Sequence, residues 1–224
     1  NIAIGRNRGG IWLSSVMPEL NRLYPDMQLT IFEDRDINML DKVLNGVLDI
    51  AIVESYVYHS SLHYLRLPSE QYMFITSCEN PRMAAYRDTA CSPEAPLDID
   101  ADWLADDLFI CPSVKGRMNR QTQRMCSTYN FQPKRTLFLA SAITAYRIAV
   151  SGMGLTFQNA AYSTFVKTKE RPLFIMPGGK ATQHHVFALF KGEPRPGLQQ
   201  DFMRLLHDRM STAIYGKVTP MEYM

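Results

Sequence analysis

The chain has 224 residues, of which 46% are hydrophobic and 21% are charged. That is enough apolar material for one large domain or two small lobes, and too much for a disordered chain. No segment approaches the roughly 18 consecutive apolar residues of a membrane helix, so we expect a soluble protein with no membrane partner. The 24 basic and 22 acidic residues give a formal charge of +2, which excludes nucleic-acid binding by a strong basic excess alone.

Cysteine spacing and the N-terminus indicate the kind of protein to expect. The four cysteines form neither a CxxC pair nor a cysteine and histidine spacing typical of zinc sites. We therefore expect thiols, as in a cytoplasmic protein, and no metal or other cofactor. The chain begins in strand-like alternation without an initiator Met or a signal segment, so we expect a domain taken from a longer protein.

The first 53 residues alternate between predicted strands and helices. Ile2–Ile4 has the pattern of a short buried strand, and the polar, glycine-rich run Arg6–Gly10 is expected to be a loop. A helix is predicted from Ile11 to Leu23, because its apolar residues recur on one face. We expect further strands at residues 29–32 and 47–53 and a helix at residues 37–44. This alternation is typical of a doubly wound α/β unit.

A second unit of the same kind is predicted after an extended crossover. Residues 62–67 and 71–76 are strand-like, which argues against a flexible linker. We then expect strands at residues 108–111, 136–139, 155–157 and 186–190, and helices at residues 118–129, 143–150 and about 198–214. The sequence therefore predicts the α/β class.

Short motifs spread along the chain occur in the order seen in one regulatory family. Residues 17–20 are Met-Pro-Glu-Leu, residues 44–52 are Leu-Asn-Gly-Val-Leu-Asp-Ile-Ala-Ile, and residues 150–156 are Val-Ser-Gly-Met-Gly-Leu-Thr. Asn80-Pro81 and the stretch from Asp102 to Ile110 add two further matches. With these motifs the chain resembles the effector-binding domain of LysR-type bacterial transcriptional regulators.

The resemblance implies a two-lobed, periplasmic-binding-protein-like fold of type II, in which each lobe is a mostly parallel sheet flanked by helices. Lobe I would comprise residues 1–76 plus 182–224, and lobe II residues 77–181, with the hinge near Thr76 and Ala181. In this family a small molecule binds in the cleft between the lobes. A winged helix-turn-helix domain, absent from this chain, precedes the lobes and binds DNA.

Such folds bind ligands at the carboxyl ends of parallel strands, beside helix N-termini whose N–H groups favour anions. The run from Arg6 to Ile11 is such a place. Gly9 and Gly10 let the backbone approach a ligand closely, and Arg6 or Arg8 would pair with a carboxylate. The alternative is that both arginines are solvated loop residues.

Further candidate contacts follow the other predicted strands. Asp36 comes after the second strand, where family members often offer a hydroxyl to the ligand. It is either a helix N-cap that needs no ligand, or a cleft residue that favours an amine or hydroxyl over an anion. Lobe II offers hydroxyl and backbone groups at its strand ends, although Ser and Thr also cap helices without a ligand. The candidate contacts across the cleft are Thr76 at the hinge and, in lobe II, Ser77, Pro112, Ser113, Ser141, Thr144 and Phe157.

Charge is distributed unevenly over lobe II. Residues 79–107 hold eight acids and two arginines, whereas residues 108–169 hold nine basic residues and no acid. This predicts either acidic and basic faces that balance each other, or a positive cleft wall that attracts an anionic effector. The wall would be formed by Lys115, Arg117 or Arg147.

No catalytic motif accompanies these features. The sequence has no G-x-S-x-G, H-E-x-x-H, phosphate-binding loop or dinucleotide fingerprint. The adjacent His184 and His185 would point to opposite faces of a strand, which disfavours a metal site. We therefore predict an effector-sensing domain that is not an enzyme. The alternatives are a solute-binding protein of a transport system and an enzyme on the same scaffold.

The expected partners are a small organic effector, a second copy of the chain, and DNA reached only through the missing N-terminal domain. Self-association is expected because regulators of this kind read paired half-sites. By analogy with the family, the helix that carries Trp12 and the helix that carries Met118 and Met125 would meet antiparallel across the dimer.

Overall fold

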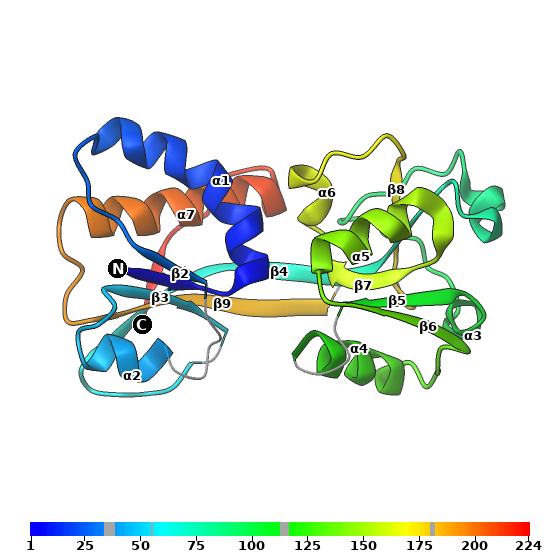
Figure 1. The fold of residues 1–224 in the computed structure, drawn as a ribbon, viewed down its shortest axis with the longest axis horizontal. Coiled ribbons are helices and arrows are strands. Elements are labelled where there is room, and N and C mark those ends of the chain that lie inside the picture. The colour runs from blue at the N-terminus through cyan, green and yellow to red at the C-terminus, as the bar shows by residue number, and fades with distance from the viewer. Residues whose placement is uncertain (34–38, 55, 113–116, 180–181) are drawn as a thin grey trace. The chain divides into compact units, whose positions relative to one another are not determined.

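The computed structural model describes residues 1–33, 39–54, 56–112, 117–179 and 182–224, and Figure 1 shows their helices and strands. These residues group into unit 1, residues 1–70 with 184–224, and unit 2, residues 71–183. The chain passes between the units along two strands, β4 (Leu62–Ser77) and β9 (Thr182–Lys191).

Three parallel strands form one side of the unit 1 sheet. β1 (Ile2–Ile4) lies between β2 (Ile31–Glu33) and β3 (Ile50–Val53) and runs parallel to both. β9 pairs antiparallel with β3, and β10 (Glu222–Tyr223) pairs antiparallel with β4. The strand order is β10-β4-β9-β3-β1-β2. The predicted parallel strands are confirmed, although β3 begins later than expected because residues 47–49 are irregular chain after the turn at residues 45–46.

Helices cover both faces of this sheet. In Figure 1, α1 (Arg6–Leu23) and α7 (Leu198–Tyr215) lie beside each other on one face, and α2 (Met39–Leu44) lies on the other. The hydroxyl of Tyr24, directly after α1, donates to Asp201 of α7 at 2.6 Å. The apolar stripes of the two helices are buried as predicted. They include Trp12, Val16, Leu20, Phe202, Leu206 and Met210.

The first helix begins five residues earlier than expected. Arg6–Gly10 was predicted to be a loop, and this is wrong, because these residues form the first turns of α1. The N–H of Gly9 donates to the carbonyl of Gly5 at 2.8 Å. A side chain on Gly9 would lie 3.2 Å from Ile4 and 3.0 Å from Glu33. Glycine therefore serves close packing of the helix against β1 and β2 here, and tertiary packing overrides its poor helix propensity.

Unit 2 combines a parallel strand pair with antiparallel strands along β4. Its strands are β5 (Leu108–Pro112), β6 (Arg135–Leu139), β7 (Thr156–Asn159) and β8 (Pro172–Ile175). Its α-helices are α3 (Ala101–Ala105), α4 (Arg117–Thr128), α5 (Ala142–Ile148) and α6 (Tyr162–Phe165). β5 and β6 run parallel, with α4 and α5 on opposite sides of them in Figure 1. β7 and β8 pair antiparallel with the second half of β4.

Two glycines of the motif at residues 150–156 have steric reasons to be glycine. After α5 the chain makes a π-type turn over Ala149–Met153, in which Gly152 has a φ of +92°. A Cβ on Gly152 would lie 2.7 Å from the carbonyl carbon of Glu79, and a Cβ on Gly154 would lie 2.3 Å from the carbonyl oxygen of Leu108. Both positions exclude any larger residue without a backbone shift.

Candidate functional site

The carboxyl ends of β2, β1 and β3 meet at one edge of the unit 1 sheet. Ile4, at the end of β1, pairs with Glu33 of β2 and with Ile52 of β3, so the three strands end side by side. Helix α1 starts directly after β1, with Gly5 as its N-cap and no side chain capping its first N–H groups. The positive end of a helix therefore lies at the edge where parallel α/β folds bind ligands.

A buried charge network lies beneath the first turns of α1. Arg8 donates from Nε to Oε1 of Glu70 at 3.0 Å and from Nη2 to Oε2 of the same residue at 2.8 Å. Nη2 also donates to Glu54, which directly follows β3. Trp12, one turn along the helix, donates from Nε1 to Oε1 of Glu70 at 2.9 Å. Side-chain exposure is 5% for Arg8, 1% for Glu70 and 14% for Glu54.

This network keeps a carboxylate charged inside the unit. Burial pushes the pKa of Glu70 upward, but the charge and hydrogen bonds of Arg8, with smaller help from Trp12 and His184, outweigh it and hold that pKa below its ordinary value. Removal of Arg8 would leave Glu70 buried without its counterion, a loss that costs about 3–5 kcal/mol in comparable pairs.

The predicted effector contacts on α1 divide into exposed and buried residues. Arg6 and Gly10 are exposed, whereas Gly9 and Ile11 are buried against the rest of the unit. The guanidinium of Arg8 already binds two carboxylates, so an effector carboxylate would meet it in competition with Glu54 and Glu70. Effector contact by these residues stays a prediction. Asp36 lies outside the described residues.

In unit 2, the hydroxyls of Thr76 and Ser77 form hydrogen bonds with backbone groups of the protein itself. Thr76 is buried and donates to the carbonyl of Gly154 at 2.8 Å. Ser77 is also buried and accepts from the N–H of Glu79 at 3.1 Å. The sequence predicted ligand contacts for both residues, and the structure shows a structural use of each hydroxyl.

The other candidates of unit 2 lie at the ends of β5, β6 and β7. Ser141 is exposed and caps α5, with its Oγ accepting from the N–H of Thr144 at 3.2 Å, which is the capping alternative named above. Thr144 is exposed as well. Pro112 and Phe157 are buried. The ring centroid of Phe157 lies 5.1 Å from the ring centroid of Phe74. Ser113 lies outside the described residues.

A second buried network was not foreseen from the sequence. The side-chain amide of Asn80 donates to Oδ2 of Asp107 at 2.7 Å and to Oγ1 of Thr76 at 3.1 Å. Oδ1 of Asp107 accepts from the N–H of Leu108 at 2.7 Å. The sequence indicates Asn80-Pro81 only as a family motif. In the structure, the side-chain amide of Asn80 fixes the turn after β4 to the start of β5.

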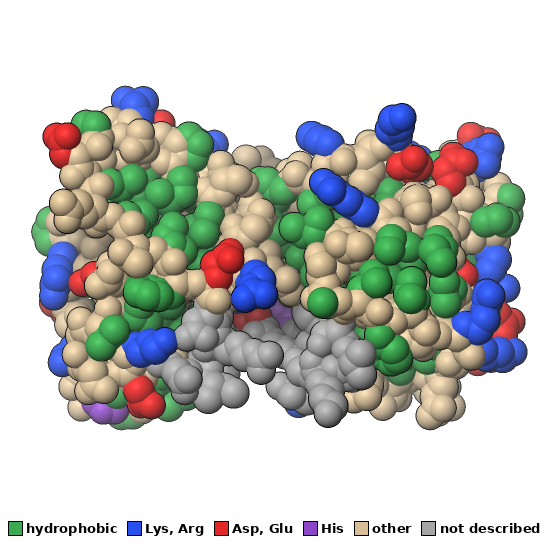
Figure 2. Space-filling model, in the orientation of Figure 1, with side chains coloured by type: hydrophobic (Ala, Val, Ile, Leu, Met, Phe, Trp, Pro, Cys, Tyr) green, Lys and Arg blue, Asp and Glu red, His purple; other side chains and the backbone are tan. Residues whose placement is uncertain are grey.

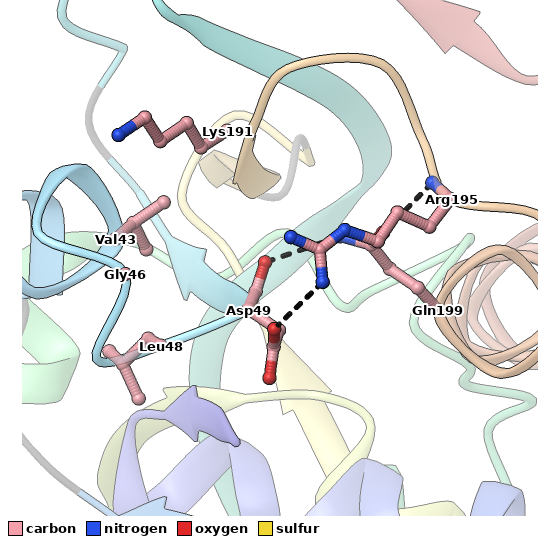
Figure 3. A pocket seen from close by; sticks show the side chains of 7 residues that line it. All are labelled: Val43, Gly46, Leu48, Asp49, Lys191, Arg195 and Gln199. Carbon is pink, nitrogen blue, oxygen red and sulfur yellow. Dashed lines mark hydrogen bonds and ion pairs between the residues drawn. The ribbon is translucent and has the colours of Figure 1, made fainter.

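A small pocket opens at the amino end of β3, away from the strand ends described above (Figure 3). Its polar residues bind each other or nearby backbone. The guanidinium of Arg195 lies 3.6 Å from Asp49, and the N–H of Arg195 donates to Gln199 at 2.9 Å. Lys191 donates to the carbonyl of Leu44 at 2.9 Å. These contacts join β9 to the end of α2, and the segment between β9 and α7 to the residue before β3, so the pocket is a structural junction.

Charges in unit 2 include pairs of opposite sign. Lys134 lies 2.5 Å from Asp106, which joins the basic segment to the acidic one. On the face shown in Figure 2, basic and acidic side chains of unit 2 lie near each other. These observations favour balanced faces over a positive wall. Arg147 is exposed, whereas Lys115 and the side chain of Arg117 lie outside the description.

The meeting of α1 and α4 across a dimer stays a prediction, and two residues named on those helices are buried. Trp12 is fully buried in unit 1, where it binds Glu70, and Met125 is buried in unit 2. Neither side chain offers a surface to a second copy. The side chain of Met118 lies outside the description, and self-association itself stays a prediction.

The described ranges contain neither a cluster of metal ligands nor a membrane-spanning helix. No three His, Cys, Asp or Glu side chains in those ranges gather as metal ligands would. Nδ1 of His185 lies 3.0 Å from the hydroxyl of Ser69. None of the helices in this part of the chain is long and apolar enough to cross a bilayer.

Comparison with known families gives one match over nearly the whole chain. Residues 1–211 match the family described as the LysR substrate binding domain. Comparison with curated protein sequences gives no match.

Solved structures share the fold at low sequence identity. The BenM effector-binding domain with its effector benzoate gives a TM-score of 0.70 at 12% identity, over 98% of this chain and 94% of that one. The regulatory domain of MetR, a LysR family regulator from N. meningitidis, gives 0.65 at 15% identity, over 100% and 96%. HinK, a LysR family transcriptional regulator from Pseudomonas aeruginosa, gives 0.67 at 10% identity, over 93% and 69%. The predicted α/β fold of the type II periplasmic-binding class is confirmed.

Proposed function

Because this chain belongs to the LysR substrate-binding domain family, we propose that it senses a small-molecule effector for a bacterial transcriptional regulator. The observation that carries the proposal is the family match over residues 1–211. The geometry supports it, since the uncapped start of α1 lies at the carboxyl edge of the parallel strands.

The effector contacts are assigned to exposed polar groups at the strand ends of each unit. In unit 1 these are Arg6 and the backbone around Gly10, on the first turns of α1. In unit 2 they are Ser141 and Thr144, at the start of α5. The effector is a small organic molecule, and its binding changes the arrangement of lobe I, residues 1–76 with 182–224, and lobe II, residues 77–181.

The remaining partners belong to the whole regulator. Full-length BenM is larger than the matched region, since this chain covers 69% of it. We assign DNA binding to an N-terminal helix-turn-helix domain joined to this one, in a cytoplasmic homodimer without catalytic activity. The near-neutral chain should not bind DNA sequence-specifically by itself.

A thermal-shift screen of this chain against small organic acids, amines and aromatic compounds tests the proposal. An effector present at about 100 times its Kd adds about 2.7 kcal/mol of stability. For a chain of this size that raises Tm by roughly 5–10 °C. The Arg6→Ala chain serves as the control for effectors that carry a carboxylate, because it should lose that shift without losing its fold.

Two results together would contradict the proposal. One is the absence of any stabilising compound, and the other is a full-length gene product without a helix-turn-helix domain.

A further inference from the structure

The carboxylate of Glu70 joins two parts of unit 1 that are distant in the sequence. Glu70 lies on β4, and its partners Arg8 and Trp12 lie on consecutive turns of α1. The Arg8 fork uses both carboxylate oxygens, and the indole N–H of Trp12 adds a third hydrogen bond. A fork between two buried planar groups fixes their relative position as well as their distance.

Glu70 also has a particular place along β4. It is the last residue of unit 1 on that strand, and Gln71 is the first residue of unit 2. The returning strand β9 enters unit 1 at His184, whose charge also acts on Glu70. Helix α1 is thus attached to the crossing strand at the residue where that strand leaves unit 1.

We propose that Glu70 is a positioning residue that couples the effector-contact end of α1 to the strand joining the two units. The proposal rests on the function proposed above in one respect, which is that effectors bind at the first turns of α1. A ligand group that moves Arg6 and Gly10 displaces Arg8 and Trp12 with them. The rigid fork passes that displacement to β4.

Glu54 provides the matched comparison. It binds the same Nη2 atom of Arg8, but it follows β3, does not lie on a crossing strand, and is partly exposed. Among the described residues, Arg8 from α1 and His184 from β9 act on the charge of Glu70, and Glu54 binds the same guanidinium of Arg8. Replacement of either glutamate by glutamine removes one charge and keeps the side-chain shape.

Hydrogen exchange of the purified chain tests the coupling without effector or DNA. In Glu70→Gln, amides at residues 6–12 and at residues 66–74, on both sides of the crossing, should exchange at least about tenfold faster than in the unaltered chain. In Glu54→Gln, faster exchange should be confined to α1 and the end of β3. Unchanged exchange at residues 71–74 in Glu70→Gln, or the same pattern in both variants, would overturn the proposal.

Trp12 reports on the charge of Glu70, because its indole N–H donates to that carboxylate. The chain has two tryptophans, so Trp103→Phe leaves Trp12 as the sole emitter. Its emission should shift during acid titration as Glu70 takes up a proton. The shift should vanish with Glu70→Gln and persist with Glu54→Gln. The same emission shift in Glu70→Gln would contradict the Trp12–Glu70 contact on which the coupling depends.

A milder variant covers the case in which Glu70→Gln does not fold. Trp12→Phe removes one donor to Glu70 and keeps the Arg8 fork, so it should accelerate exchange in the same two segments by a smaller factor. Exchange confined to α1 would count against the proposal. Because no effector is added, failure here leaves effector sensing intact, and failure of the effector screen leaves the coupling intact.

Discussion

The side-chain amide of Asn80 donates a hydrogen bond to the carboxylate of Asp107 across 2.7 Å in the interior of unit 2. The same amide nitrogen donates to the hydroxyl of Thr76, which in turn donates to the carbonyl of Gly154. One chain of hydrogen bonds therefore joins β4, the turn after it, the start of β5 and the glycine turn before β7. Each link depends on its neighbours, because buried polar groups without partners are costly.

Thr76→Val should destabilise the protein by about 1–3 kcal/mol, because it removes both the donor to Gly154 and the acceptor for Asn80 while keeping the side-chain volume. Urea unfolding measures the difference. Thr144→Val is the matched control, since that threonine is exposed on α5, and it should change stability by less than about 0.5 kcal/mol. Equal effects of the two substitutions would contradict the role given to the network.

Gly154→Ala should destabilise the protein by more than about 4 kcal/mol or prevent folding, because its Cβ would lie 2.3 Å from a backbone oxygen that cannot move alone. Gly216→Ala is the control. Gly216 has a φ of +70° at the end of α7 with no described atom near its Cβ, so it should cost only roughly 1–2 kcal/mol. Similar losses for both variants, measured by chemical unfolding, would mean that the contact with Leu108 relaxes easily.

Tyr146→Phe should make the protein more resistant to alkali. Burial raises the pKa of Tyr146 to about 12, and its hydroxyl has no hydrogen-bond partner among the described residues. Above pH 10 the unfolded chain ionises this tyrosine while the folded chain keeps it neutral, so stability falls as pH rises to about 12. The loss is about 2–3 kcal/mol, and the variant should lack it. Unfolding free energies of both chains between pH 9 and 12 give the comparison, and parallel curves would refute the assignment.

Arg6→Ala should weaken binding of a confirmed effector by a few kcal/mol if that effector carries a carboxylate, and should change folding stability by about 0.5 kcal/mol or less. Arg6 is exposed on the first turn of α1, and no described carboxylate forms an ion pair with it. Arg22→Ala, at the other end of the same helix and paired with Glu19, should leave affinity unchanged. Calorimetry on the three chains decides the matter, and unchanged affinity in Arg6→Ala would remove this residue from the site.

The helices and strands could be predicted because their buried apolar residues recur along the sequence with the period of a helix or a strand. The apolar stripe of α1 and the short strands β1, β5 and β6 lie within a few residues of the predicted ranges. The start of α1 could not be predicted, because the run Arg6–Gly10 has a loop-like composition. It becomes helical through the contact of Gly9 with β1 and β2, which only the folded chain brings close.

The site was harder to predict than the fold, because charge partners are distant in the sequence. The position of Arg8 after a predicted strand makes it a candidate contact, but its partners Glu54 and Glu70 are 46 and 62 residues away in the sequence. One signal was present. Glu70 is the only acid in the sixteen residues of β4, which are otherwise mostly buried, and such an acid requires a buried cation. Sequence spacing alone does not say which arginine supplies it.

The division of the chain between the units sets the order in which they can fold during synthesis. Unit 2 is one continuous segment, residues 71–183, whereas unit 1 takes β9, α7 and β10 from the last 41 residues. A ribosome therefore delivers every residue of unit 2 before the first unit has its sheet completed. Until β9 is synthesised, residues 1–70 lack the strand that pairs with β3, so the edge of β3 is open to pairing with other chains. The segment of this protein most prone to aggregation during synthesis is therefore its N-terminal strands.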